Sequence, residues 1–323
     1  MSHNRKVSRT SRCYESVSDL KEMHQLLMAA RARTDDWHYP HVGELQFAFF
    51  MVLCHLDPHG HIRLWHDADR KLIGYSILGE DPSLDWQVAP EHEWTGIESE
   101  AIAWAEDRLA ALRAREPGQW GGGTVSGARQ DNAHRIAFLE QHRFRYRGDF
   151  SEVNLLRSLQ DPIPAAIAPE GFTVRGLFAD KEIPVRAAAQ REVWSPWTVG
   201  KVSDDDYLNL TQLPGYHQDL DVVGVTSDGL VAAYVNGWID EVNGIGDFGP
   251  VGALPAYRRL GLTRAVLVEA LHRMRDHGMN RVCVSTTEGN TAARRLYESL
   301  GFTVVNRYLE CVQDRMANTG GSA

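Results

Sequence analysis

Two predicted helices on either side of a short strand, all within residues 251–302, constrain the fold of this 323-residue chain more than any other feature. Apolar residues recur at helical spacing after the turn 255–261, and a glycine at position 278 marks the end of that helix. In residues 281–286, Val282, Val284 and Thr286 alternate onto one face, which predicts a strand. A second helix is predicted over residues 290–301. This order is typical of a sheet flanked by helices.

The first of these helices begins with features that favour an anion. The amides at a helix start lack partners within the helix and carry the positive end of its dipole, so they bind phosphate oxygens where the backbone is accessible. Gly261 leaves the backbone accessible, and Arg258, Arg259 and Arg264 crowd the same turn. Taken alone, such arginines are more often a solvated helix start.

The second helix presents a mixed face. Asn290, Ala293 and Tyr297 are spaced at i, i+3 and i+7, so a polar cap, a small residue and a phenol lie on one side. A tyrosine in such a place is, by itself, more often a half-buried core residue. The coincidence of both helix starts around one strand favours a functional interpretation of both.

Two motifs here resemble the acetyl-CoA-binding core of the GNAT superfamily of N-acetyltransferases. The pyrophosphate loop of that family, Arg/Gln-x-x-Gly-x-Gly/Ala, is matched by Arg258 and Gly261, whereas Thr263 stands where a smaller residue is usual. The later pattern, Asn-x-x-Ala-x-x-x-Tyr-x-x-x-Gly-Phe, is matched over residues 290–302. The resemblance covers about the last third of the chain and implies acetyl-CoA as cofactor. The cofactor-binding residues that it implies are Val251, Gly252, Ala253, Arg258, Arg259, Leu260, Gly261, Leu262, Thr263, Arg264, Asn290, Ala293 and Tyr297.

The resemblance also implies catalytic roles. Tyr297 would be the general acid, because its phenol would lie near the sulfur as the thiolate forms. The strand ending at residues 251–254 would pair with pantetheine and polarise the thioester carbonyl, and Gly252 suits such a close approach. The general base is left open among Asp240, Glu241, Asp247 and a water chain. Glu241 is the first choice and Asp247 the second.

The first half of the chain echoes the second. Residues 132–144 align without a gap on residues 290–302, and residues 88–96 align on residues 253–261. We therefore predict an α/β protein of two tandem GNAT folds, each a twisted mixed β-sheet flanked by α-helices. The predicted boundaries are 1–158 for a degenerate N-terminal domain, 159–171 for a proline-rich linker and 172–323 for a catalytic C-terminal domain.

The N-terminal copy differs at chemically important positions. Glu93 stands at the position of Arg258 and opposes phosphate, and Leu139 replaces the phenol of Tyr297. We expect this copy to be structural and catalytically silent.

Its helix start is predicted to be blocked. Glu98 takes the position of Thr263, and Thr95 with Glu98 forms the Thr-x-x-Glu pattern of a capping box, in which side chains occupy the first amides. Arg135, at the position of Ala293, leaves residual binding of a CoA phosphate open.

Composition is consistent with a soluble cytoplasmic enzyme. An apolar share of 43% supports sizeable cores, and a net charge of -9 argues against nucleic acid as partner. No apolar run approaches the ~20 residues that span a bilayer, so we expect no membrane partner. The four cysteines, Cys13, Cys54, Cys283 and Cys311, show no paired spacing, which favours a reducing cytosol.

Other polar clusters favour structural interpretations. His55, His59 and His61 lack a convincing ligand set, even if the last two share a strand face, so no metal site is predicted. The segment Ser203–Asp206 reads as a helix cap rather than a calcium loop. The segment Trp194–Trp197 falls where GNAT enzymes build the acceptor pocket and is a candidate for lining it.

The substrate is not readable beyond a small-molecule amine, and a monomer or a homodimer is expected. The layout is similar to that of mycothiol synthases, which have two GNAT folds with only the second competent, so an acyltransferase of that kind is one alternative. A non-catalytic CoA-binding or interaction protein is the other.

Overall fold

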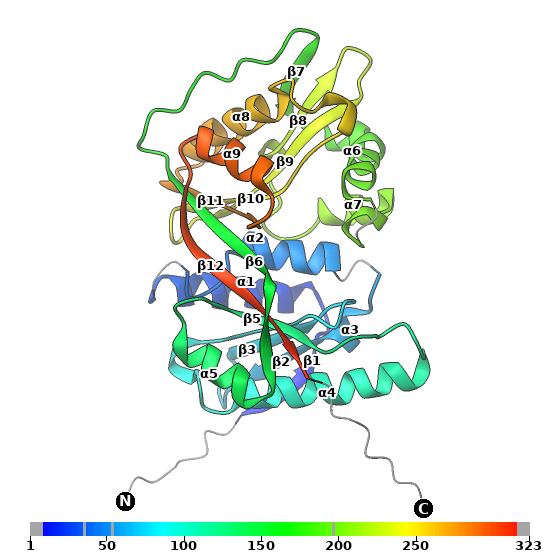
Figure 1. Ribbon diagram of the computed structural model, residues 1–323, viewed down its shortest axis with the longest axis vertical. Coiled ribbons are helices and arrows are strands. Elements are labelled where there is room, and N and C mark those ends of the chain that lie inside the picture. The colour runs from blue at the N-terminus through cyan, green and yellow to red at the C-terminus, as the bar shows by residue number, and fades with distance from the viewer. Residues whose placement is uncertain (1–8, 35–36, 53–54, 196–197, 315–323) are drawn as a thin grey trace, which may run out of the picture. The chain divides into compact units, whose positions relative to one another are not determined.

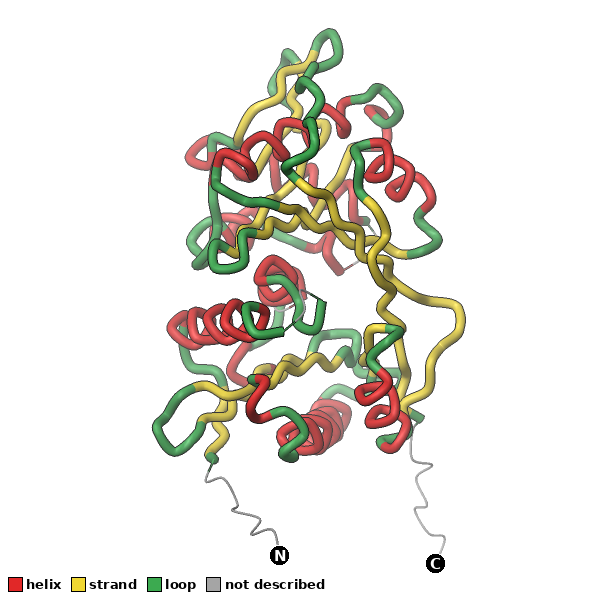
Figure 2. The backbone as a smooth tube through the Cα atoms, turned by 90° about the vertical axis from the view of Figure 1, so that its left-hand side faces the viewer, coloured by secondary structure: helices red, strands yellow, loops and turns green. Residues whose placement is uncertain are grey.

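The computed structural model describes residues 9–34, 37–52, 55–195 and 198–314. They form two compact units, neither of which is continuous in sequence (Figures 1 and 2). Unit 1 takes in residues 9–14, 58–152 and 306–314, and unit 2 takes in 15–57 and 153–305 with the gaps given above. The long strands β6 (Phe144–Ser158) and β12 (Thr303–Gln313) contribute residues to both units.

Unit 1 contains an antiparallel sheet in the order β1-β2-β3-β4. All seven residues of β3 are buried, and α4 packs against β3 and β4. A separate strand, β5, pairs antiparallel with β12. The other elements of unit 1 are β1 (Thr10–Cys13), α3 (Pro58–His61), β2 (Ile62–His66), β3 (Leu72–Leu78), β4 (Leu84–Val88), the 3-10 turn η2 (Pro90–His92), α4 (Ile97–Arg115), β5 (Val125–Arg129) and α5 (Ala133–Gln141).

Unit 2 is built on strands in the order β6-β11-β10-β9-β8-β7. The pairs from β7 to β10 are antiparallel, and β10 and β11 are parallel. Its other elements are α1 (Val17–Arg31), α2 (Val42–Phe47), the π-helical turn η1 (Ala48–Val52), β7 (Phe172–Gly176), α6 (Ala179–Trp194), η3 (Thr198–Lys201), α7 (Asp204–Leu210), η4 (Gln218–Leu220), β8 (Asp221–Thr226), β9 (Val231–Asp240), β10 (Ile245–Ala253), η5 (Pro255–Tyr257), α8 (Leu262–Asp276), β11 (Arg281–Thr287) and α9 (Thr291–Ser299).

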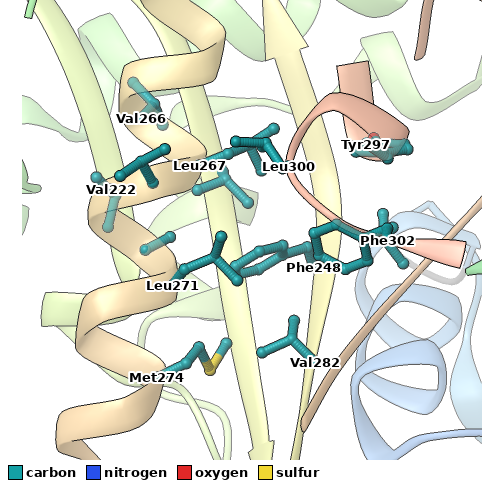
Figure 3. Close-up of a cluster of buried hydrophobic side chains, with 14 of the residues drawn as sticks. Val222, Phe248, Val266, Leu267, Leu271, Met274, Val282, Tyr297, Leu300 and Phe302 are labelled. Atoms are coloured by element: carbon teal, nitrogen blue, oxygen red, sulfur yellow. The ribbon is translucent and has the colours of Figure 1, made fainter. Parts of the chain in front are cut away.

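Two apolar clusters cover the two faces of this sheet. Val222 of β8 belongs to the cluster that α8 and α9 share, whereas its neighbour Val223 belongs to the cluster under α6 and α7. This alternation places the two clusters on opposite faces. Figure 3 shows the first cluster, in which Phe248 and Val282 of the strands meet Leu271 of α8.

The three elements predicted between residues 262 and 301 are confirmed as α8, β11 and α9. Gly278 and Gly301, which follow the two helices, both have positive φ, as expected for glycines that end helices. The cap predicted at Ser203 is also confirmed, since its hydroxyl oxygen accepts the amide of Asp206 at 3.1 Å.

The capping box predicted for the N-terminal copy is wrong. Helix α4 begins after Gly96, which has φ 106°, and no side chain caps it. The Thr95 hydroxyl instead donates to the His92 carbonyl at 2.7 Å, and the Glu98 carboxylate accepts the amide of Trp94 at 2.7 Å. Glu98 therefore binds the loop one residue earlier than the pattern predicts.

Histidines 59 and 61 do not share a strand face, because both lie in α3. Each places a ring nitrogen near a backbone carbonyl, His59 that of Tyr14 and His61 that of Leu78. Three cysteines, Cys13, Cys283 and Cys311, are free thiols, and Cys54 lies outside the described residues. None of the helices described here combines the length and the apolar character that crossing a bilayer requires.

Candidate functional site

The start of α8 has an accessible backbone. Gly261 is its N-cap with φ 83°, no side chain caps the helix, and a Cβ at Gly261 would meet nothing within 4 Å. Arg258 is exposed on the same turn, and its Nε donates to the Ala253 carbonyl at 3.1 Å. An uncapped helix start with a neighbouring guanidinium can hold a phosphate or pyrophosphate group.

The parallel strands β10 and β11 diverge beside this helix start. Their pairing runs from Ile245 with Arg281 to Phe248 with Val284, although β10 continues to Ala253. A bulge in β10 between Phe248 and Val251 changes its register against β9 at the same point. The backbone of β10 beyond the bulge therefore faces no β11 partner in the described register. An extended amide-containing ligand can pair with such an edge.

Gly252 lies on this diverging segment. A Cβ there would come within 2.5 Å of the phenol of Tyr234 on β9, so the neighbouring strand already requires glycine at this position. The Tyr234 hydroxyl accepts a hydrogen bond from Trp194 Nε1 at 2.9 Å.

The other predicted cofactor-binding residues surround the same region with different exposure. Leu262 is buried in the core, whereas Leu260 is 51% exposed. Arg259 and Arg264 are both exposed, and Arg259 has a positive φ of 65°. Val251, Ala253, Thr263 and Ala293 are half-buried.

Tyr297 lies on α9, whose start is capped by Asn290. The Asn290 side chain accepts the amide of Ala293 at 3.2 Å. Tyr297 is buried among Phe248, Phe302 and Leu300 (Figure 3). Burial and the negative charge of Asp247 both raise the pKa of Tyr297. The phenol is therefore protonated at neutral pH and able to donate its proton.

Asp247 is buried on β10, and burial raises its pKa to about 6. The Cys283 thiol donates to its Oδ1 at 3.4 Å, and the positive charge of Arg31 opposes the rise in pKa. A Cβ at Gly43 of α2 would come within 2.6 Å of Asp247 Oδ2. Helix α2 therefore packs directly on this carboxyl group, which titrates in the range useful for a general base.

His41 lies 4.0 Å from the same carboxylate but forms no ion pair with it. Its Nδ1 accepts the Gly43 amide at 2.9 Å, and its Nε2 lies 3.1 Å from the Ile245 carbonyl. Burial lowers the pKa of His41 to about 3, so the ring is neutral and positions α2 against β10.

The two other carboxylates considered as bases lie at the β9–β10 turn. Asp240 is fully buried and is held by Arg31, at 3.6 Å, and by Asn243, at 2.6 Å. Glu241 is exposed. The Asp240 carboxylate is therefore engaged by groups of the protein itself, whereas the Glu241 carboxylate is accessible to a bound molecule.

A cavity of about 290 Å³ lies within unit 2, next to Glu241. Trp238, which pairs with Asp247 across β9 and β10, forms part of its wall. His24 of α1 is 8% exposed there, its Nε2 has no hydrogen-bond partner, and burial lowers its pKa to about 4. The lining residues are His24, Met28, Val42, Gln46, Gly215, His217, Trp238, Ile239, Glu241 and Val242.

No sequence motif marks His24 or Gln46, so the contribution of α1 and α2 to this cavity could not be predicted. Trp194 is not among the lining residues, and Pro196 and Trp197 lie outside the described residues.

In unit 2, a mixed sheet with a diverging parallel strand pair, an uncapped helix that starts at a glycine and a further helix after β11 form a GNAT fold. The solved structures below that share the fold over most of both chains include a tandem GNAT protein. Residues 187–302 match the model of the Acetyltransferase (GNAT) family. Two solved structures share the overall fold. A GCN5-related N-acetyltransferase from Sphaerobacter thermophilus has a TM-score of 0.63 at 20% identity and covers 94% of each chain. A tandem GNAT protein from the clavulanic acid biosynthesis pathway has a TM-score of 0.64 at 13% identity and covers 98% of this chain and 100% of its own.

Similar curated proteins are mycothiol acetyltransferases. That of Thermobispora bispora is 31% identical over 46% of this chain and 52% of its own length. That of Stackebrandtia nassauensis is 25% identical over 76% of this chain and 80% of its own length. The alignment with the first relative therefore spans only about half of that protein.

Proposed function

We propose that this chain is an acetyl-CoA-dependent N-acetyltransferase that acts on a small-molecule amine. The chemistry would take place in unit 2, which contains residues 172–305 of the C-terminal domain predicted over residues 172–323. The observation that carries the proposal is the placement of Tyr297 and Asp247. The two groups interact electrostatically, and Asp247 lies just before β10 diverges from β11.

The residues present fit acetyl-CoA. The open start of α8 and the guanidinium of Arg258 would hold the pyrophosphate, and the unpaired edge of β10 from Val251 to Ala253 would hold the pantetheine amides. When bound, acetyl-CoA supplies an activated acetyl thioester.

The side chains then supply two proton transfers. Asp247, with a pKa of about 6, is ionised at neutral pH and accepts a proton from the attacking amine, directly or through a water. Tyr297 Oη donates a proton to the departing sulfur. Both groups are buried, which strengthens their interaction with reacting charges.

Among the candidate bases, the geometry favours Asp247 over Glu241. The negative charge of Asp247 acts on Tyr297, and the pKa of Asp247 is raised toward the working pH. Glu241, in contrast, is exposed on the wall of the cavity. In this proposal Glu241 attracts the cationic amine, and the cavity beside it receives the acceptor. The apolar wall of Trp238 and Ile239 favours an acceptor with an apolar part.

A second candidate is an acyltransferase of the mycothiol acetyltransferase kind. The alignment with the Stackebrandtia nassauensis protein over 76% of this chain supports it. The free thiols described above fit a reducing cytoplasm in either case.

The test combines binding with turnover on the full-length protein. Calorimetry with acetyl-CoA should give one site per chain. Thiol release should depend on the amine for at least one member of a panel of small amines. Mass spectrometry of the purified protein would identify any bound CoA or amine. If acetyl-CoA binds but no amine in the panel causes release of the CoA thiol, the non-catalytic CoA-binding alternative is favoured.

A further inference from the structure

We propose that His217, Asp219 and His277 form a binding site for a divalent transition-metal ion, for which Zn²⁺ is the test ion. One ligand atom from each of the three side chains lies within 4.8 Å of the others. The residues come from the segment before β8 and from the end of α8. This proposal does not depend on the proposed acetyl transfer.

The three side chains lie close together. His277 Nε2 lies 2.7 Å from Asp219 Oδ2, and the rings of His217 and His277 are 5.3 Å apart. The side chain of Asp219 is 53% exposed and that of His277 is 27% exposed, so an ion can reach them from solvent. Small rotations of these side chains would bring the three ligand atoms around one ion.

The local charge favours a cation. His277 is the C-cap of α8, where the helix dipole is negative. Asp276 and Glu269 border the same surface hollow, which measures about 380 Å³. Arg273 is the opposing charge, but its Nε pairs with Glu269 at 2.8 Å and its Nη1 donates to the backbone carbonyl of Asp219. Both of these contacts engage groups other than the Asp219 carboxylate.

The ligand set determines the class of metal. Two imidazoles and one carboxylate suit zinc and similar borderline ions, whereas Ca²⁺ and Mg²⁺ prefer oxygen ligands alone. Three protein ligands leave a fourth position for water. The ion would join two segments 58 residues apart in the chain. Because His217 also lines the cavity in unit 2, the metal would fix one part of the cavity wall.

The experiment uses tag-free, full-length protein treated with a chelator and then titrated with Zn²⁺ by calorimetry. We expect one site with a Kd of about 10 μM or tighter. Co²⁺ in place of Zn²⁺ should give visible absorption bands of a low-coordinate nitrogen and oxygen site. The thermal midpoint should rise with Zn²⁺ concentration, because the ion binds the folded state.

His277→Gln and Asp219→Asn should each weaken Zn²⁺ binding at least tenfold, and both keep groups able to hydrogen-bond. Circular dichroism of each variant before titration checks that the fold is retained. His55→Gln, an exposed histidine outside the cluster, is the matched control and should bind like the wild type. No saturable binding below about 100 μM, or unchanged binding in both variants, would overturn the proposal.

Discussion

The loop before α4 in unit 1 and the loop before α8 in unit 2 have nearly the same backbone. Both contain a 3-10 turn after a strand, Pro90–His92 and Pro255–Tyr257. Trp94 and Arg259 both have positive φ, 60° and 65°, and the helix N-caps Gly96 and Gly261 do as well. The duplicated sequence therefore preserves the turn, and only the side chains distinguish the two copies.

Side chains fill the first loop and leave the second open. Arg9 donates to the Thr95 carbonyl at 3.1 Å, and its Nη2 lies 3.1 Å from where a Cβ at Gly96 would be. The Glu98 carboxylate accepts the Trp94 amide. Around Gly261 the corresponding space holds no atom within 4 Å of a Cβ. A phosphate group has room at the second loop but meets protein atoms at the first.

The strand divergence in unit 1 is also filled. An isolated parallel bridge joins Ser83, the residue before β4, to Val125 at the start of β5. The guanidinium of Arg135 donates to the Gly127 carbonyl at 2.8 Å and to the Trp86 carbonyl at 3.5 Å, and it stacks over the Trp86 ring. Arg135 therefore lies between β4 and β5 of unit 1. The corresponding gap in unit 2, between β10 and β11, is the one that we propose holds pantetheine. These contacts favour a silent N-terminal copy and leave Arg135 little freedom to bind a CoA phosphate.

The largest effect on activity is expected at Tyr297, whose phenol is present in unit 2 and is replaced by Leu139 in unit 1. Tyr297→Phe should lower kcat by about 10- to 1000-fold with little change in the Kd for acetyl-CoA, because it removes the proton donor and little packing. Steady-state thiol release and calorimetry measure the two quantities. Leu139→Ala, at the equivalent position in unit 1, should change stability but leave kcat per folded molecule unchanged. Full turnover in Tyr297→Phe would return this residue to a purely structural role.

Asp247→Asn should lower kcat/KM by about 10- to 100-fold, a smaller loss because water can accept the proton in its place. In the wild type, kcat/KM should rise with pH through about 6, where Asp247 ionises, and then level off. The variant should lack this rise.

Glu241→Gln is the matched control for that experiment. Glu241 is exposed, so the variant should keep the pH profile of the wild type and raise KM for a cationic amine by only a fewfold. The opposite pattern, an intact profile in Asp247→Asn and a lost one in Glu241→Gln, would assign the base to Glu241.

The local elements of the site could be predicted from sequence, because the periodicity of α8 and the cap at Asn290 are short-range signals. The prediction of a capping box at Thr95 failed because the Thr95 hydroxyl donates to the His92 carbonyl instead. The sequence pattern alone does not specify the partner of this hydroxyl. The environment of Asp247 was also beyond prediction. It depends on His41, which is 204 residues from its contact at Ile245, and no motif marks the segment that supplies it.

Arg258→Glu gives the second loop the charge of the first, where Glu93 stands at the equivalent position. We expect the Kd for acetyl-CoA to rise at least tenfold, since a charge-assisted contact contributes roughly 1.5–3 kcal/mol. Calorimetry on the full chain measures it. The reciprocal change, Glu93→Arg, should create no second site, because Arg9 and Arg135 still fill unit 1. Unchanged affinity in Arg258→Glu would remove this residue from the cofactor site.

Arg135→Ala tests whether the filled gap in unit 1 is structural. The change removes hydrogen bonds to Trp86 and Gly127 carbonyls, and the side chain is only 14% exposed. We expect unfolding in urea to show a loss of about 1–3 kcal/mol. Arg115→Ala, whose side chain is 73% exposed, should change stability by less than about 0.5 kcal/mol. Equal effects in the two variants would contradict a structural role for Arg135.

The smallest effect is expected for Glu98→Ala, which removes the carboxylate from the first loop. The Trp94 amide loses its acceptor, and we expect a loss of about 1 kcal/mol in unfolding free energy. Acetyl-CoA stoichiometry should stay at one per chain, because Arg9 beside Gly96 and Arg135 between β4 and β5 remain in place. A second equivalent of acetyl-CoA bound by Glu98→Ala would mean that this one carboxylate, rather than the filled gap, keeps the N-terminal copy silent.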